Sequence, residues 1–322
     1  MQDAPIVSII CNTYNHEKYI AHALDGFLMQ HTDFTFEILI HDDASTDSTA
    51  DIIRNYAERY PNIIKPILQD KNQFGKGVNV TQTFQYPRAK GKYIAVCEGD
   101  DYWIDANKLQ LQVNWLECHP DDIGCVHKYI VVDEDENIQN IKTFGYYEHE
   151  ERYTLKDFEN KELPSQLASL MFRNIVNDPS TKYPELFNKI KIQGDIKLFL
   201  YLLAYGSIYR MPQVCSAYRF VFHKGGQSWS SRSIGTVRGY RDWIALQELE
   251  QAFFEKYGQK VFLKKRKVAA AATTVADFIN FRTWNNLKNA VTVIFRQKGC
   301  LSRVVQLAFR KIKIKLGING VD

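Results

Sequence analysis

The sequence lacks the features of secreted and membrane-spanning proteins. Its six cysteines include no Cys-x-x-Cys pair and no regular spacing, which favours a reduced setting with free thiols. No charged-then-apolar secretory segment opens the chain, and no run approaches the roughly 20 apolar residues of a membrane span. We therefore expect a cytoplasmic protein that does not cross the bilayer unaided.

Two common nucleotide-binding signatures are also missing. No Gly-x-Gly-x-x-Gly follows the first predicted strand, and no Walker lysine occurs. Their absence argues against a dinucleotide site or a P-loop.

The composition is that of a globular protein with an uneven charge. The 322 residues are 45% hydrophobic and 13% aromatic, which excludes a disordered chain. The net charge is only +4, yet the segment from Phe262 to the end carries 13 Lys and Arg against two Asp. This asymmetry suggests an acidic catalytic body and a basic tail that prefers an anionic surface.

The order of the predicted elements indicates an α/β fold. Nearly continuous apolar strands at residues 5–11, 36–41 and 92–97 alternate with segments of helical period. Such strands are typical of a doubly wound, mostly parallel sheet with helices on both faces. From about residue 233 the pattern is helical and increasingly basic.

Two acidic clusters follow predicted strands. Residues 41–47 (His-Asp-Asp-Ala-Ser-Thr-Asp) come after the strand that ends near Ile40, and residues 98–101 (Glu-Gly-Asp-Asp) come after the strand that ends at Cys97. Ligands of open α/β sheets bind beyond the carboxyl ends of the strands. Because crowded carboxylates repel one another, we expect Mg²⁺ or Mn²⁺ to bridge them to a substrate diphosphate.

The ordered set of motifs resembles the family 2 glycosyltransferases. The motifs are Thr13-Tyr14-Asn15, the acidic cluster at 42–47 and the acidic cluster at 98–101, all after strands. The resemblance covers roughly residues 5–230 and implies an inverting, sugar-nucleotide-dependent enzyme of the GT-A fold. It divides the chain into a catalytic domain and a helical extension, with these boundaries: nucleotide-binding half about 1–130, acceptor half about 131–232, helical C-terminal extension 233–322.

The resemblance also implies which residues bind the nucleotide. A carboxylate after the second strand would accept the imide N–H of uracil or a ribose hydroxyl. In the alternative interpretation, Asp42, Ser45 and Asp47 only cap the following helix. The expected nucleotide-binding residues are Thr13, Tyr14, Asn15, Asp42, Asp43 and Asp100.

For the metal, the resemblance points to Asp101 first and to His223 second. The family's acidic motif is commonly Asp-x-Asp-Asp, and this chain departs from it with Glu98 at the first position. Contacts to the acceptor or the diphosphate are expected from Trp103, Arg219 and Trp229. For Trp103, packing beneath the acidic loop remains an equal alternative.

Asp195 is the expected general base. The family places a catalytic carboxylate at the start of a helix that faces the acceptor, and Gly194-Asp195 opens an amphipathic segment. A helix N-terminus favours the anionic form, so we expect this carboxylate to be deprotonated at neutral pH. The alternative is an ordinary helix cap.

The sequence therefore predicts transfer of a sugar from a nucleotide-diphosphate donor, taken to be a UDP-sugar, onto a hydroxyl of a glycan or lipid-linked glycan. The alternatives are a nucleotidyltransferase of related architecture and a non-catalytic nucleotide-sugar-binding module. We expect no nucleic-acid partner. Apolar residues of 301–312 share one helical face flanked by basic residues, which suggests a peripheral position on the inner face of an anionic membrane. A helix packed on the catalytic domain would explain the same stripe.

Overall fold

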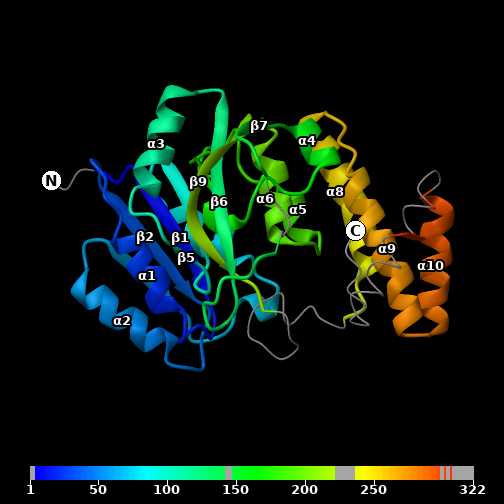
Figure 1. The fold of residues 1–322 in the computed structure, drawn as a ribbon, viewed down its shortest axis with the longest axis horizontal. Helices are drawn as coiled ribbons and strands as arrows, with labels where there is room; N and C mark the ends of the chain where they lie inside the picture. The colour runs from blue at the N-terminus through cyan, green and yellow to red at the C-terminus, as the bar shows by residue number, and fades with distance from the viewer. Residues whose placement is uncertain (1–3, 142–146, 222–235, 298–300, 302–304, 307–322) are drawn as a thin grey trace. The chain divides into compact units, whose positions relative to one another are not determined.

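The computed structural model describes residues 4–141, 147–221, 236–297, 301 and 305–306 (Figure 1). The chain divides into two compact units. The sheet unit comprises residues 1–154, 163–183 and 201–234, and the helical unit comprises residues 155–162, 184–200 and 235–322.

A parallel half of the sheet contains the first strands of the chain. β1 (Val7–Thr13) pairs in parallel with β2 (Phe36–Asp42) on one side and with β4 (Tyr93–Val96) on the other. β3 (Ile64–Leu68) continues the parallel pairing beside β2. These strands read as apolar runs because both faces of the sheet are covered. Their carboxyl ends therefore meet at one edge, where Thr13 is in register with Asp42.

The rest of the sheet is mixed. Among the described residues one nine-stranded sheet runs in the order β3-β2-β1-β4-β8-β6-β9-β5, with β7 beside β9. The predicted α/β fold is confirmed, and its second half pairs in both directions: β8 is antiparallel to β4 and to β6, while β6 is parallel to β9. The strands of this half are β5 (Tyr102–Trp103), β6 (Asp122–Val132), β7 (Glu151–Tyr153), β8 (Met171–Arg173) and β9 (Ser207–Arg219).

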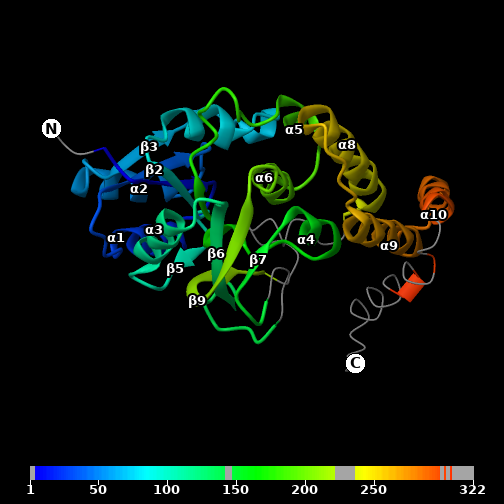
Figure 2. The same ribbon diagram turned by 90° about the horizontal axis from the view of Figure 1, so that it is seen from above.

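Helices cover the sheet on both faces (Figure 2). Helical spacing predicts one apolar face of α1 (Ile20–Leu28). Of its residues, Ile20, Ala23, Leu24 and Phe27 are buried and Leu28 is half-buried. α1 and α3 (Lys108–Cys118) lie on one face, and the short turns η2 (Thr81–Gln85) and η3 (Tyr86–Arg88) lie on the other. The remaining elements of this unit are α2 (Thr49–Arg59), η1 (Phe74–Lys76) and η4 (Leu167–Ser169).

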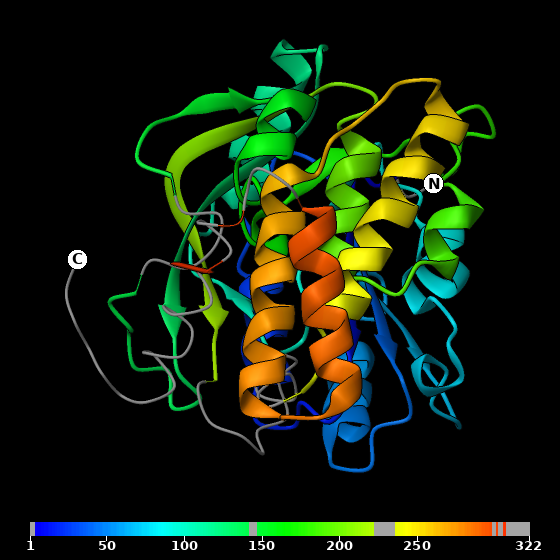
Figure 3. The ribbon, with the colours of Figure 1, turned by 90° about the vertical axis from the view of Figure 1, so that its right-hand side faces the viewer.

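The helical unit is built around α9 (Lys264–Asn280). α9 packs against α8 (Gly239–Tyr257) and α10 (Trp284–Arg296), and the Asp277 carboxylate accepts the N–H of Gly239 at 2.9 Å (Figure 3). The helical C-terminal region is thus confirmed. No described helix is both long and apolar enough to span a bilayer. The other helices of the unit are α4 (Leu155–Asn160), α5 (Glu185–Lys189) and α6 (Gly194–Leu202), whose last two residues belong to the sheet unit.

Candidate active site

The loops after β1 and β2 are tied to each other. Asn15 has a left-handed backbone (φ 57°), and its N–H donates to Ser45 Oγ at 2.8 Å. The Asn15 Oδ1 atom accepts the N–H of Thr46 at 2.8 Å. The motif residues after the first strand therefore shape the first acidic cluster, 31 residues further along the chain.

The carboxylates of the first acidic cluster act as backbone anchors. Asp42 accepts the N–H of Ser45 at 3.0 Å, and Asp43 accepts the N–H groups of Gln73 and Phe74 at 2.8 and 2.9 Å. Both carboxylates are buried. Through Asp43 the cluster thus holds the turn η1 beside the end of β2.

Asp47 lies one residue before the N-cap position of α2, which Ser48 occupies. Its Oδ1 atom accepts the N–H of Thr49, the first residue of α2, at 3.0 Å. Ser45 instead lies within the loop and bonds to Asp42 and Asn15.

The second acidic cluster forms a tight turn after β4 and lies against β1. A Cβ atom on Gly99 would lie 2.8 Å from Thr13 Oγ1 and 3.0 Å from His16 Nδ1, so no larger residue fits without displacing the turn. Both of those polar atoms are buried and have no hydrogen-bond partner among the described residues. Because position 99 is glycine, residues 98–101, below called the acidic turn, can contact the first motif.

Asp101 and Asp100 differ in exposure and in partners. Asp101 is 3% exposed, and its oxygens accept the backbone N–H of Arg219 at 2.8 Å and the Gln166 Nε2–H at 2.6 Å. Burial, with the Asp100 charge next in importance, raises the pKa of Asp101 well above its usual range. The Asp100 side chain is 17% exposed, and its Oδ2 lies 4.0 Å from His16 Nε2. Asp101 is therefore anchored, while Asp100 presents the more open carboxylate.

The Arg219 guanidinium joins the acidic turn to the loop at residues 133–137, below called the second loop. Its Nε donates to the Asp100 carbonyl oxygen at 2.9 Å, and its Nη1 donates to the carbonyl oxygens of Asp133 and Glu134 at 3.0 and 3.3 Å. Its Nη2 pairs with Glu136 Oε1 at 2.9 Å. The side chain has no exposed surface. Arg219 was expected at the acceptor or diphosphate, yet these bonds engage all three of its nitrogens within the protein.

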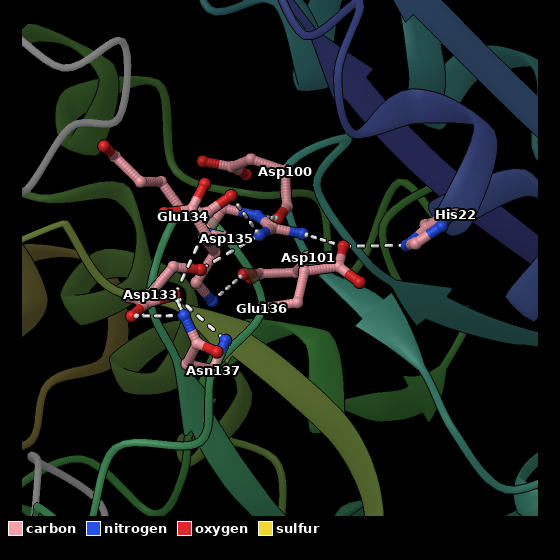
Figure 4. A network of polar contacts seen from close by, with 9 residues as sticks. His22, Asp100, Asp101, Asp133, Glu134, Asp135, Glu136 and Asn137 are labelled. Carbon is pink, nitrogen blue, oxygen red and sulfur yellow. Dashed lines mark hydrogen bonds and ion pairs between the residues drawn. The ribbon is translucent and has the colours of Figure 1, made fainter.

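The second loop is itself ordered by polar contacts (Figure 4). Asp133 Oδ1 accepts the N–H groups of Asp135 and Asn137 at 3.0 and 2.9 Å. Glu136 has a left-handed backbone (φ 68°), and its Oε1 also lies 2.7 Å from His22 Nδ1 on α1. The clamp thus connects the acidic turn, the second loop and α1.

Trp103 belongs to the core. It is 2% exposed, its Nε1–H donates to the Ala168 carbonyl oxygen at 2.9 Å, and its ring lies 4.7 Å from that of Phe27. The packing alternative therefore describes Trp103 better than contact with a substrate. Tyr14 is half-buried at the end of β1. His223 and Trp229, predicted for the metal and the acceptor, lie outside the described residues.

The donor chemistry of the site suits a hard divalent cation. The acidic turn and the second loop together carry seven carboxylates, and the buried Arg219 guanidinium bonds to both segments. Oxygen ligands of this kind bind Mg²⁺ and Mn²⁺. Within the described part of the chain, no group of three or more His, Cys, Asp and Glu side chains is arranged to hold a metal. The seven carboxylates are Glu98, Asp100, Asp101, Asp133, Glu134, Asp135 and Glu136.

Asp195 belongs to the helical unit and lies in the first turn of α6. Its Oδ1 accepts the N–H of Ile196 at 2.7 Å. We expected the helix N-terminus to favour the anion, but burial outweighs that bond and the Arg266 charge, so the pKa of Asp195 is raised.

The comparisons with known proteins agree on one family. The sequence model of Glycosyl transferase family 2 matches residues 8–178, which is more than half of the chain. The chain belongs to this family. Its resemblance to the family 2 glycosyltransferases is thereby confirmed.

Relatives in bacteria share the first part of the chain. An uncharacterised Mycobacterium tuberculosis protein, Rv1520, is 47% identical over 129 residues, which cover 40% of this chain and 36% of the relative. The Escherichia coli UDP-Glc:alpha-D-GlcNAc-diphosphoundecaprenol beta-1,3-glucosyltransferase WfaP is 36% identical over 112 residues, covering 35% of this chain and 41% of WfaP. Each match thus spans less than half of the relative's own length.

A solved structure shows the same fold over most of the chain. The Staphylococcus aureus protein TarS (residues 1–349, in complex with UDP-GlcNAc) has a TM-score of 0.60 at 18% identity, and the match covers 94% of this chain and 83% of that one. At this identity the likeness supports the GT-A fold alone.

Several site residues escaped the sequence analysis. Gln166, His22 and Glu136 contact the site from segments that carry no motif. The polar run at 133–137 predicts a loop, but nothing local indicates that the loop meets Arg219. The local signal of a close approach was Gly99, a glycine between acidic residues.

Proposed function

We propose that this protein transfers a sugar from a UDP-sugar onto a hydroxyl of a glycan or lipid-linked glycan, with inversion at the anomeric carbon. Membership of Glycosyl transferase family 2 supports the reaction class. The relative WfaP is named for transfer from UDP-Glc to a GlcNAc-diphosphoundecaprenol acceptor, which supports the donor and acceptor classes. The complex of TarS with UDP-GlcNAc supports a UDP-sugar as well.

The observation that carries the proposal is the clamped acidic turn at the carboxyl end of β4. In this proposal Asp100 faces the donor diphosphate, and Asp101 holds the turn through its bonds to Arg219 and Gln166. Asp101 remains a predicted metal ligand, sharing the site with Asp100. A bound Mn²⁺ or Mg²⁺ would supply positive charge to offset that of the departing diphosphate.

The loops after β1 and β2 would hold the nucleotide. Because the carboxylates of Asp42 and Asp43 already accept backbone N–H groups, we propose that they act mainly by fixing these loops. Thr13, Tyr14 and Asn15 stay predicted nucleotide contacts.

Asp195 is the proposed general base. A raised pKa makes its carboxylate a stronger base than an ordinary Asp, while leaving it a smaller ionised fraction at low pH. An inverting transfer needs one such group to take the proton of the acceptor hydroxyl as the new bond forms.

A donor screen tests the proposal. The protein would be incubated with a panel of UDP-sugars, a lipid-linked glycan acceptor and Mn²⁺, and the products separated by chromatography. Release of UDP, abolished in EDTA, is the expected result, and NMR of the transferred sugar would report the anomeric configuration. In a parallel incubation with UTP and a sugar 1-phosphate in place of the UDP-sugar, release of pyrophosphate would instead indicate a nucleotidyltransferase. Tight UDP-sugar binding without any product would indicate a non-catalytic module.

Matched variants separate the two carboxylates of the acidic turn. Asp100→Asn should weaken UDP binding with Mn²⁺ much more than in EDTA, because the charge facing the cation is lost. Asp101→Asn should in addition lower stability, because Asp101 has two buried donors. Equal affinity of the wild type for UDP with and without metal would contradict the metal-dependent mechanism.

A further inference from the structure

The inner face of α10 is packed within the helical unit. Asn286, Ala290 and Val293 are buried, and α10 lies alongside α9 (Figure 3). The Thr283 side chain caps the helix by accepting the N–H of Asn286 at 3.2 Å. Burial of this face explains why the segment is helical. It does not explain the side chains on the opposite face.

The opposite side of α10 exposes large apolar side chains in one line. Trp284 is 81% exposed, Val291 43% and Phe295 68%. Residues at i, i+7 and i+11 lie on the same face of a helix. Single exposed apolar residues are ordinary, but an aligned stripe that includes a tryptophan marks an interaction surface. We call Trp284, Lys288, Val291 and Phe295 the outer stripe.

The charge around the outer stripe has one sign. Lys288 lies within it, and Arg282 and Arg296 flank it, all three exposed. Residues 278–321 contain nine Lys and Arg and no Asp or Glu. A partner for this surface must therefore present apolar material together with negative charge.

We propose that the outer stripe of α10 docks on an anionic phospholipid bilayer. Tryptophan and phenylalanine insert favourably at the headgroup level, and Lys and Arg beside them meet the anionic headgroups. A second copy of the chain fits less well, because a two-fold interface would set each basic stripe against the other. In the sequence the outer stripe precedes the predicted membrane-binding stripe at 301–312.

Vesicle binding by the full-length protein tests the proposal. Co-sedimentation would compare vesicles of phosphatidylcholine alone with vesicles that also contain phosphatidylglycerol. Binding is expected only to the anionic vesicles and should weaken as salt increases. Lys288→Gln should weaken it about fivefold, the equivalent of one basic residue near the surface. Trp284→Ala should weaken it about tenfold or more through lost apolar burial.

A matched variant controls for general loss of apolar surface. Phe254 on α8 is also exposed, at 41%, and is followed by Glu255, so Phe254→Ala should bind vesicles like the wild type. Quenching of Trp284 emission by brominated lipids should disappear in Trp284→Phe while binding persists. These variants alter exposed side chains, and circular dichroism would verify that they fold.

Three results would overturn the proposal. The first is wild-type protein that ignores anionic vesicles at low salt. The second is vesicle binding that survives in the double variant Trp284→Ala/Phe295→Ala, which would assign the contact to another segment. The third is concentration-dependent self-association, seen by analytical ultracentrifugation and lost in Trp284→Ala, with no vesicle binding.

Discussion

Replacing Arg219 with lysine should disturb both the stability of the sheet unit and the proposed donor site. The guanidinium makes four contacts of 3.3 Å or less, to the carbonyl oxygens of Asp100, Asp133 and Glu134 and to the Glu136 carboxylate. Lysine keeps the positive charge but offers a single nitrogen without the planar fork. It can satisfy one or two of the four acceptors, so the acidic turn loses its fixed position.

The magnitude follows from the burial of these groups. A hydrogen bond that involves a charged group contributes about 1.5–3 kcal/mol, and leaving a buried acceptor unpaired costs about 1–3 kcal/mol. The ion pair with Glu136 counts for less, because that carboxylate is 32% exposed and screened by solvent. Since the losses share one network and are not additive, we expect the free energy of unfolding to fall by about 2–4 kcal/mol.

The assay compares Arg219→Lys with Arg173→Lys. Arg173 on β8 also bonds to carbonyl oxygens, those of Leu116, His119 and Asp122 at 2.6–3.1 Å, but it does not contact the acidic turn. Urea denaturation should show a loss of stability in both variants. Calorimetric titration with UDP and Mn²⁺ should show weaker binding only in Arg219→Lys. Equal UDP affinity in both variants would mean that Arg219 is merely structural, and an unchanged stability would refute the energetic argument.

Three further predictions concern other parts of the molecule. Burial lowers the pKa of Lys108, whose Nζ donates to Gln112 Oε1 at 2.6 Å, from 10.5 to about 8. Between these two pH values the unfolded chain binds one proton more than the folded chain, so the free energy of unfolding should rise by about 3 kcal/mol from pH 8 to 10.5. Urea titrations at several pH values should show this rise in the wild type and not in Lys108→Met. The same rise in Lys108→Met would refute the prediction. Asp195→Asn should lower UDP release by about 10²- to 10⁴-fold with donor affinity kept, and a near-wild-type rate would move the base elsewhere. Gly99→Ala should cost about 10²-fold in rate, because its Cβ would lie 2.8 Å from Thr13 Oγ1, and full activity would show that the turn tolerates displacement.

The local pattern of the sequence was enough to predict the first strands and the first helix of the sheet unit. Nearly continuous apolar runs predicted β1, β2 and β4, and helical spacing predicted the buried face of α1, because these signals depend on neighbouring residues only. The acidic clusters could be placed at the carboxyl edge of the sheet for the same reason, since each follows its strand directly.

The partners of the site residues were decided by the tertiary structure. Arg219 and Asp101 are 118 residues apart in the sequence, and Gln166 and Asp101 are 65 apart. Their contacts depend on the pairing of β9 with β5 and β6, which no local pattern specifies. Burial of Trp103 and anchoring of Asp43 by η1 likewise arise from segments that meet only in the folded chain. The sequence alone determined which residue types stand at the edge of the sheet, while long-range pairing decided which of them are anchored and which stay open to a ligand.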